Sequence, residues 1–158
     1  MIRIGLGYDI HPFEPGRKLM LGGVHIPHSA GLAGHSDGDA LVHAIIDALL
    51  GAMGEGDIGQ LFPADPKTQG TDSLTYLADV MRRVEAGAWR IVNVDTVIVT
   101  ELPKIAPHVA AMKAALGPLL GIPETALGIK GKTNEGLGPV GEGKAIACWA
   151  TALIETRR

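Results

Sequence analysis

The segment from residue 39 to residue 53 constrains the fold more than any other part of the chain. Its apolar positions repeat with the 3.6-residue period of an α-helix. These positions are Leu41, Ala44, Ile45, Ala48, Leu49 and Ala52. Three polar residues, Asp39, His43 and Asp47, are spaced four apart and therefore form one line along the same helix. The segment is too apolar to lie on a surface, so we expect a buried helix that carries a polar stripe into the interior.

The remaining segments predict a mixture of strands and helices around this central helix. Strands are expected over residues 2–13, 89–100, 127–133 and 145–154, a hairpin over 18–27, and further helices over 72–87 and 103–121. This order favours an α/β (α+β) two-layer sandwich, in which helices cover one face of a mixed, mostly antiparallel four-stranded sheet, plus the small β-hairpin. A chain of 158 residues suits one domain spanning residues 1–158.

Asp9 and His11 lie two residues apart in the first predicted strand, so their side chains project from the same face. If the central helix packs across that strand, His43 joins them. Two imidazoles and one carboxylate form a ligand set suited to zinc with one coordination position open. The alternative is an ordinary pair of strand residues beside a hydrogen-bonded core histidine. Asp39 is expected to cap the helix and to orient His43.

Residues 54–71 are rich in Gly, Asp and Pro and predict a long loop, of a length that is usually functional. Asp57 and Asp65 in this loop have two open interpretations. They serve turn formation, or they belong to a mobile lid whose carboxylates accept hydrogen bonds from substrate hydroxyls.

Two polar segments in the second half of the chain also have alternative interpretations. Lys104 follows a predicted strand and is either a solvated lysine at a helix start or a ligand contact. Thr133 or Asn134 is a candidate helix cap, and a helix start with hydroxyl groups also binds anions. Glu135 suits such an anion site if a divalent cation mediates. Metal ions reverse the local field of carboxylates, so a phosphate site among these acidic residues requires them.

Composition excludes several partners. The net charge is −3 and the basic residues are scattered, so no nucleic-acid footprint is visible. Charged residues, Gly and Pro interrupt each apolar run before it reaches membrane-spanning length. The first residues lack the pattern of a signal peptide. Cys148 is the sole cysteine, which excludes an internal disulfide, fits the cytoplasm and suits a small buried apolar position.

Taken together, several motifs resemble the 2-C-methyl-D-erythritol 2,4-cyclodiphosphate synthase family, in order and along the whole chain. They are Gly7-Tyr8-Asp9-Ile10-His11, His35-Ser36-Asp37-Gly38-Asp39 with His43, Gly56-Asp57-Ile58-Gly59 with Leu61-Phe62-Pro63, Asn93-Val94-Asp95, Pro103-Lys104 and Thr133-Asn134-Glu135-Gly136-Leu137-Gly138. The resemblance implies a homotrimer with active sites between subunits. It also implies cyclisation of 4-diphosphocytidyl-2-C-methyl-D-erythritol 2-phosphate, with release of CMP, in the non-mevalonate isoprenoid pathway.

The resemblance further implies residue roles. Asp9, His11 and His43 hold zinc, Glu135 holds magnesium or manganese, and His35 and Thr133 stabilise the transition state. The implied substrate contacts are Asp9, Ile10, His11, His35, Ser36, Asp57, Ile58, Gly59, Phe62, Asp65, Thr100, Pro103, Lys104, Ile105, Ala106, Lys132, Thr133, Asn134 and Glu135. The run Phe62-Pro63-Ala64-Asp65 is one residue shorter than the Phe-Pro-Asp-x-Asp run common in the family.

Two other functions compete with the cyclase. A zinc-dependent phosphoesterase or other hydrolase would use the open zinc position to activate water, but no Glu-x-x-His pair or evident water-activating base accompanies the trio. A non-catalytic trimeric metal- or nucleotide-binding module is disfavoured by the many polar residues in apolar surroundings, because buried polar groups are costly.

Overall fold

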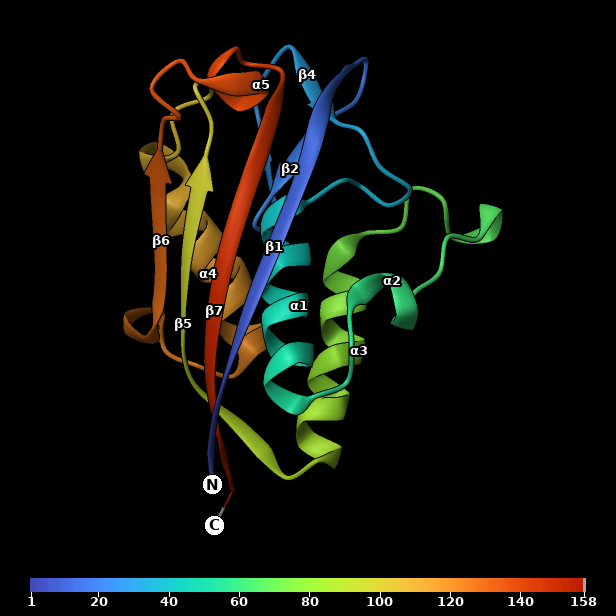
Figure 1. Cartoon of the computed structure of the whole chain (residues 1–158), viewed down its shortest axis with the longest axis vertical. Coiled ribbons are helices and arrows are strands. Elements are labelled where there is room, and N and C mark those ends of the chain that lie inside the picture. The colour runs from blue at the N-terminus through green and yellow to red at the C-terminus, as the bar shows by residue number, and fades with distance from the viewer. Residues whose placement is uncertain (158) are drawn as a thin grey trace.

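The computed structural model describes residues 1–157. Its central feature is a five-stranded sheet in the order β4-β1-β7-β5-β6 (Figure 1). The strands are β1 (Ile2–Pro15), β4 (Ala30–Leu32), β5 (Trp89–Val99), β6 (Leu127–Lys132) and β7 (Ala145–Thr156), and the separate hairpin consists of β2 (Leu19–Leu21) and β3 (Val24–Ile26). β5 and β6 run parallel, and the other neighbours in the sheet run antiparallel. The predicted fold class is confirmed, with the short edge strand β4 as an addition.

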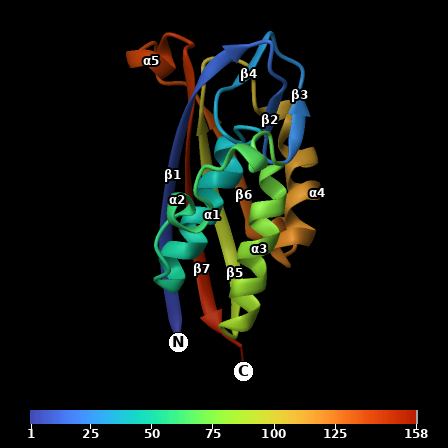
Figure 2. The ribbon, with the colours of Figure 1, turned by 90° about the vertical axis from the view of Figure 1, so that its right-hand side faces the viewer.

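The long helices gather on one face of this sheet, as predicted (Figure 2). The long helices are α1 (Ala40–Met53), α3 (Ser73–Ala86) and α4 (Val109–Leu120), and two single-turn helices are α2 (Ile58–Leu61) and α5 (Gly138–Gly141). Short 3-10 turns cover Pro66–Thr68, Ala106–His108 and Glu124–Ala126. The expected long loop over residues 54–71 is therefore partly ordered by α2 and the first of these turns.

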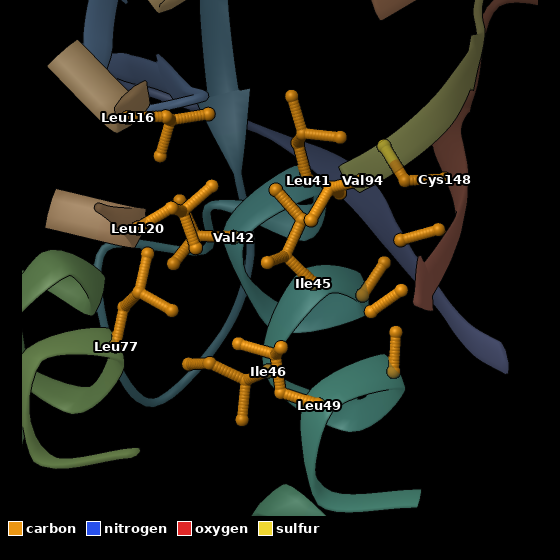
Figure 3. Close-up of a cluster of buried hydrophobic side chains, with 14 of the residues drawn as sticks. Leu41, Val42, Ile45, Ile46, Leu49, Leu77, Val94, Leu116, Leu120 and Cys148 are labelled. Atoms are coloured by element: carbon orange, nitrogen blue, oxygen red, sulfur yellow. The ribbon is translucent and has the colours of Figure 1, made fainter. Parts of the chain in front are cut away.

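Helix α1 lies at the centre of the core, as its apolar sequence predicts. It begins after the N-cap Asp39 and ends at Gly54, which adopts the left-handed conformation. Its side chains Leu41, Val42, Ile45, Ile46 and Leu49 pack among side chains from two other helices and the sheet (Figure 3). The surrounding residues drawn there are Leu77 of α3, Val94 of β5, Leu116 and Leu120 of α4, and Cys148 of β7. Cys148 is fully buried, as expected.

Two glycines of β1 bring α1 unusually close to the sheet. A Cβ atom on Gly5 would lie 1.9 Å from the carbonyl oxygen of Ala48, and one on Gly7 would lie 1.9 Å from that of Ala44. No side chain other than hydrogen fits at either position, because real Cβ atoms do not approach backbone so closely. The small residues on both sides let the helix backbone rest directly on the strand, which places His43 beside Asp9.

The opposite face of the sheet is uncovered and apolar. Alternation along β1 sends every second side chain to this face. The large exposed side chains here are Ile2, Ile4, Leu6, Tyr8 and Ile10 of β1 and Trp149 of β7. The rings of Tyr8 and Trp149 contact each other, with their centroids 4.8 Å apart. Among residues 1–157, no helix has both the length and the apolar character needed to cross a membrane.

Candidate active site and metal centre

Asp9, His11 and His43 converge, as the strand and helix periodicities predict. Asp9 Oδ2 lies 2.7 Å from His11 Nε2 and 3.0 Å from His43 Nδ1, and the two imidazole nitrogens are 3.2 Å apart. Three donor atoms on a tetrahedral zinc ion with bonds of 2.0–2.1 Å would be about 3.3 Å apart. The donor types and their spacing therefore fit zinc, or another divalent cation that accepts nitrogen and oxygen ligands.

The three side chains also perturb one another electrostatically. Burial by itself would raise the pKa of Asp9, but hydrogen bonds and positive charge from His11 and His43 outweigh it, so this pKa lies below its usual value. Burial would lower the pKa of His11, but the neighbouring Asp9 carboxylate more than compensates and raises it. The cluster thus stabilises a negative carboxylate and attracts positive charge, which is the behaviour of a cation site.

Each imidazole has a second contact that fixes its orientation. His11 Nδ1 lies 2.5 Å from the carbonyl oxygen of Ala33, so Nδ1 carries the proton and Nε2 is left as a metal donor. His43 Nε2 lies 2.9 Å from Ser73 Oγ and 3.1 Å from Ser36 Oγ, which leaves Nδ1 directed at Asp9.

Asp39 caps α1 as predicted, but it does not orient His43. Its Oδ1 atom accepts hydrogen bonds from the backbone N–H groups of Val42 and Gly22, at 3.0 and 2.9 Å. Its Oδ2 atom accepts from Gly23 at 2.7 Å. The fully buried carboxylate therefore joins the α1 N-terminus to the β2–β3 turn. Its oxygens are directed to these backbone groups, so the expectation that it positions the His43 ring is wrong.

Asp47, the third member of the polar stripe, connects α1 to α2. Its Oδ1 atom accepts a hydrogen bond of 2.7 Å from the backbone N–H of Ile58. Burial, followed by the nearby negative charges of Asp57 and Asp9, raises the pKa of Asp47, although the Ile58 bond opposes this shift. In this stripe, Asp39 is a structural cap, His43 is a metal-ligand candidate and Asp47 anchors the loop through Ile58.

A pocket of about 270 Å³ opens above the metal-ligand candidates. Its lining residues are Asp9, His11, His35, Ser36, His43, Ile58, Gly59, Phe62, Ala64 and Tyr76. We call this the metal pocket. It brings together seven of the substrate contacts implied by the resemblance, which are Asp9, His11, His35, Ser36, Ile58, Gly59 and Phe62. Its polar floor and apolar α2 side suit a ligand with a phosphate and a carbon skeleton.

Arg17 holds the segment that carries His35 and Ser36. Its guanidinium group donates hydrogen bonds to the carbonyl oxygens of Gly34 and Ser36, at 2.8 and 2.6 Å. These carbonyls flank His35, so Arg17 determines how the segment presents its side chains to the pocket. Sequence reasoning missed this residue, because no periodicity relates a turn after β1 to a loop seventeen residues later.

His35 is linked to the loop that follows α2. Its Nε2 atom lies 3.1 Å from Thr68 Oγ1 and accepts the backbone N–H of Asp65 at 3.3 Å. Its carbonyl oxygen accepts the backbone N–H of Gly70 at 2.7 Å. The loop therefore contacts the side of the metal pocket, and any displacement of the loop changes the environment of this imidazole.

Among the implied substrate contacts in residues 9–65, three do not line the metal pocket: Ile10, Asp57 and Asp65. Asp57 caps α2 by accepting the backbone N–H of Gln60 at 2.9 Å, and Asp65 similarly accepts that of Lys67 at 2.9 Å. Both carboxylates thus act in turn formation, the first of their two interpretations. Ile10 lies between two pocket residues of β1, so its side chain projects from the opposite face and is exposed.

A second pocket, of about 170 Å³, lies at the β5–β6 side of the sheet. Its lining residues are Thr100, Pro103, Lys104, Ile105, Ala106, Gly131, Lys132 and Thr133. We call this the edge pocket. It shares no lining residue with the metal pocket, and β7 separates β5 from β1 in the sheet. The structure therefore gathers the implied contacts of residues 100–106 and 132–133, but places them apart from Asp9 and His43.

Glu135 lies next to the edge pocket in a tight turn. Thr133 Oγ1 donates a hydrogen bond of 3.2 Å to Glu135 Oε1, and the backbone N–H of Asn134 donates to Glu101. Glu135 has a φ angle of 53°, in the left-handed region. The suggestion that Thr133 or Asn134 caps a helix is wrong, because the chain turns here and α5 begins only at Gly138. The Glu135 carboxylate is exposed, so it can reach a cation on a bound diphosphate.

Comparisons with known proteins agree with one family. The model of the YgbB family matches residues 2–155. A protein of Gloeobacter violaceus named 2-C-methyl-D-erythritol 2,4-cyclodiphosphate synthase is 54% identical over 155 residues, which cover 98% of this chain and 95% of that protein. A Plasmodium falciparum IspF structure, a CDP complex, has a TM-score of 0.89 at 38% identity, covering 99% of this chain and 97% of that one. The bifunctional IspDF from Campylobacter jejuni has a TM-score of 0.94 at 34% identity, and this chain covers 42% of it.

Proposed function

The chain belongs to the YgbB family of 2-C-methyl-D-erythritol 2,4-cyclodiphosphate synthases, and from this premise we propose how its two pockets perform the reaction. The enzyme cyclises 4-diphosphocytidyl-2-C-methyl-D-erythritol 2-phosphate to 2-C-methyl-D-erythritol 2,4-cyclodiphosphate and releases CMP, in the non-mevalonate isoprenoid pathway. The observation that carries the assignment is the convergence of Asp9, His11 and His43 beneath a pocket lined by His35 and Ser36. We assign the enzyme to the cytoplasm, where the thiol of Cys148 stays reduced.

The reaction requires alignment and charge neutralisation more than acid–base catalysis. An oxygen of the substrate's 2-phosphate attacks the β-phosphorus of the cytidine diphosphate group. The bond between that phosphorus and the oxygen leading to the α-phosphate breaks, and CMP leaves with this oxygen. The nucleophile is already an anion, so no strong general base is needed. Phosphoryl transfer of this kind depends mainly on positioning and on electrostatic stabilisation.

The residues of the two pockets divide these tasks. Zinc held by Asp9, His11 and His43, and magnesium or manganese held by Glu135, would supply positive charge that neutralises the phosphate oxygens. Ser36 and His35 donate hydrogen bonds to phosphate oxygens at the metal pocket. Ile58, Gly59 and Phe62 pack against the methylerythritol carbon skeleton and exclude water from the reacting phosphates.

The edge pocket binds the cytidine diphosphate group. Its backbone and the side chains of Lys104, Lys132 and Thr133 line a recess of suitable polarity for a nucleotide and its phosphates. Thr133 donates a hydrogen bond to the β-phosphate, which is the group transferred, from the side opposite His35. The CDP complex of the structurally similar Plasmodium falciparum protein supports a cytidine nucleotide as ligand.

The working enzyme is a homotrimer in which the metal pocket of one subunit faces the edge pocket of its neighbour. Two observations support this arrangement. First, the two pockets lie on different sides of one chain, whereas a single substrate must reach both. Second, the uncovered sheet face with Ile2, Ile4, Leu6, Tyr8 and Trp149 is a large exposed apolar patch, which is typical of an interface. Light scattering after size-exclusion chromatography tests the trimer, and a monomeric protein with full activity would contradict it.

Phosphorus NMR tests the reaction. Purified protein is incubated with zinc, magnesium and the diphosphocytidyl substrate, and the products are followed over time. Cyclic diphosphate and CMP in equal amounts are the expected products. A linear phosphate formed by attack of water would instead identify the zinc-dependent hydrolase, and the absence of turnover with both metals present would identify a non-catalytic binding module.

A further inference from the structure

We infer that Ser73 and Asp37 are positioning residues, which hold the His43 imidazole in the orientation and tautomer that a metal ligand needs. The inference rests on the proposed zinc site and adds residues from outside the metal pocket to it. Ser73 comes from the first turn of α3, and Asp37 comes from the loop before α1. Neither residue lines the metal pocket. Their contribution to metal binding is therefore made through His43.

The contacts form a continuous chain from the metal ligand to a carboxylate. His43 Nε2 lies 2.9 Å from Ser73 Oγ. The Ser73 hydroxyl donates a short hydrogen bond to Asp37 Oδ1, and the Ser73 backbone N–H donates to Asp37 Oδ2 at 3.2 Å. The backbone N–H of Asp39 donates a further bond of 3.1 Å to Asp37 Oδ1. Asp37 is thus held by three donors and can act only as an acceptor toward Ser73.

The position of each proton follows from these contacts. If His43 Nδ1 binds a cation, it carries no proton, so the ring proton must be on Nε2. The Ser73 hydroxyl has one proton, and it goes to Asp37. Ser73 Oγ is therefore free to accept the Nε2 proton of His43. A carboxylate acceptor makes hydrogen bonds stronger and shorter, so Asp37 makes Ser73 a better acceptor for the ring.

Burial makes this chain of contacts rigid. Ser73 is fully buried, and His43 is 8% exposed. Water has little access to the Nε2 atom, so loss of the serine hydroxyl would leave a buried ring N–H with one weaker partner, Ser36 at 3.1 Å. Outer contacts of this kind commonly set the orientation and basicity of a metal-bound histidine.

The same placement of protons, on His43 Nε2 and between Ser73 and Asp37, explains how the Ser36 hydroxyl remains available for substrate. Nε2 of His43 is a donor in this arrangement, so it cannot accept the Ser36 hydroxyl proton. Ser73 Oγ accepts the ring proton with one lone pair, and its other lone pair is a distant acceptor for Ser36, whose Oγ is 3.3 Å away. The Ser36 hydroxyl can therefore turn into the metal pocket, which it lines, and donate to a phosphate oxygen. Ser73 and Ser36 are neighbours with different tasks: one orients the metal ligand and the other meets the phosphate.

Metal affinity in the absence of substrate tests the inference. Zinc-free protein is titrated with zinc against a competing chelator, and with cobalt(II), whose visible absorption reports ligand geometry. Ser73→Ala is expected to weaken zinc binding about 10- to 100-fold and to alter the cobalt spectrum. Asp37→Asn is expected to cause a smaller loss, because the amide oxygen still accepts the Ser73 hydroxyl. Ser36→Ala is expected to keep zinc affinity within about twofold of wild type while weakening substrate binding.

A matched control separates positioning from helix stability. Asp72 caps α3 by accepting the backbone N–H of Leu74 at 2.8 Å and is the neighbour of Ser73. Asp72→Ala should lower the midpoint of chemical denaturation, because α3 loses its cap, without changing zinc affinity. The inference would be overturned if folded Ser73→Ala bound zinc as tightly as wild type, or if Ser36→Ala lost zinc affinity and Ser73→Ala did not. Either result would leave the proposed function intact. A wild-type protein that binds no zinc would instead overturn the proposed metal site.

Discussion

The metal pocket and the edge pocket are built in opposite ways. In the metal pocket, the ligand candidates come from a central strand and a buried helix, and each ring nitrogen of His11 and His43 has a partner. In the edge pocket and the adjoining turn, Lys104, Lys132 and Glu135 are exposed, and the backbone of Glu135 is in the left-handed region. A left-handed conformation costs a residue with a side chain about 1–2 kcal/mol.

This difference indicates that one half of the site is preorganised and the other half is completed on binding. Charged donor atoms that converge before the cation arrives need little rearrangement to bind it. The side chains of Lys104, Lys132 and Glu135 at the edge pocket are exposed, so under the proposed function it is the bound nucleotide that positions them. Substitutions in the metal pocket should therefore change the stability and the zinc content of the protein. Substitutions at the edge pocket should instead change the concentrations of nucleotide ligand and magnesium that activity requires.

The largest effect is expected from Gly7→Ala, which would break the preorganised half outright. The new Cβ would lie 1.9 Å from the backbone of Ala44, so β1 and α1 must separate. We expect a loss of more than about 3 kcal/mol in the free energy of unfolding, measured by chemical denaturation, together with loss of zinc binding.

Gly51→Ala is the matched control, a glycine on helix α1, which is the helix that Gly7 contacts. A Cβ there meets its nearest atom at 3.9 Å, an ordinary contact. Alanine favours helix over glycine by up to about 1 kcal/mol, so this variant should be as stable as wild type or more stable. Equal stability of the two variants would show that the direct helix–strand contact is not needed.

His43→Ala should have the next largest effect, on metal content rather than on folding. One of three protein ligands is lost, so zinc affinity should fall by more than the roughly 100-fold seen when an outer partner of a ligand is removed. Cyclisation should fall with it, and the trimer should remain. Zinc content by mass spectrometry and the oligomeric state by light scattering check both statements. Zinc bound at wild-type stoichiometry would exclude His43 as a ligand.

Glu135→Gln examines the edge pocket and should leave folding and zinc content unchanged. An amide is a weaker magnesium ligand than a carboxylate, so the magnesium concentration for half-maximal activity should rise, by about tenfold. Activity at saturating magnesium should recover in large part. An unchanged magnesium requirement would remove Glu135 from the second cation site.

The smallest effect is a pH dependence at Asp47. Its pKa is raised above the ordinary value of 3.8, so the folded protein retains this proton to higher pH than the unfolded chain does. The stability contributed by Asp47 is therefore largest below pH 3.8 and is lost as pH rises from there through the raised folded pKa. Asp47→Asn keeps an acceptor for the Ile58 N–H but has no carboxyl group to titrate. Its free energy of unfolding therefore does not fall with pH on account of residue 47. Its stability relative to wild type should rise across that interval in unfolding titrations, and a constant difference would contradict the shift.

Periodicity predicts much of this molecule. The alternation of β1 and the 3.6-residue repeat of residues 39–53 are sufficient to predict the layers and the meeting of Asp9, His11 and His43. These signals are local and physical, because apolar faces must be buried together. The helix expected over residues 72–87 is also present, with Asp72 as its cap.

Contacts between loops leave no comparable signal. Arg17 reaches the carbonyls beside His35, and Ser73 reaches His43, across distances in sequence that no repeat connects. The orientation of Asp39 toward the hairpin, rather than toward His43, depends on how a turn packs against a helix start. Similarly, the turn at Glu135 places this residue in the left-handed region beside Gly136, which is also there, and glutamate is an uncommon choice for such a position.

The alternation of β1 also limits how the length of this chain can change. Asp9 and His11 face α1, whereas Tyr8 and Ile10 face the uncovered side of the sheet. Insertion or deletion of one residue ahead of them would exchange the two sets, so the metal-ligand candidates would lie on the uncovered face of the sheet and apolar side chains would face α1. The run at residues 62–65 lies in a loop that pairs with no strand, so a change of length there exchanges no such sets. Evolution and protein engineering can therefore alter the length of that loop, but not the length of the first strand.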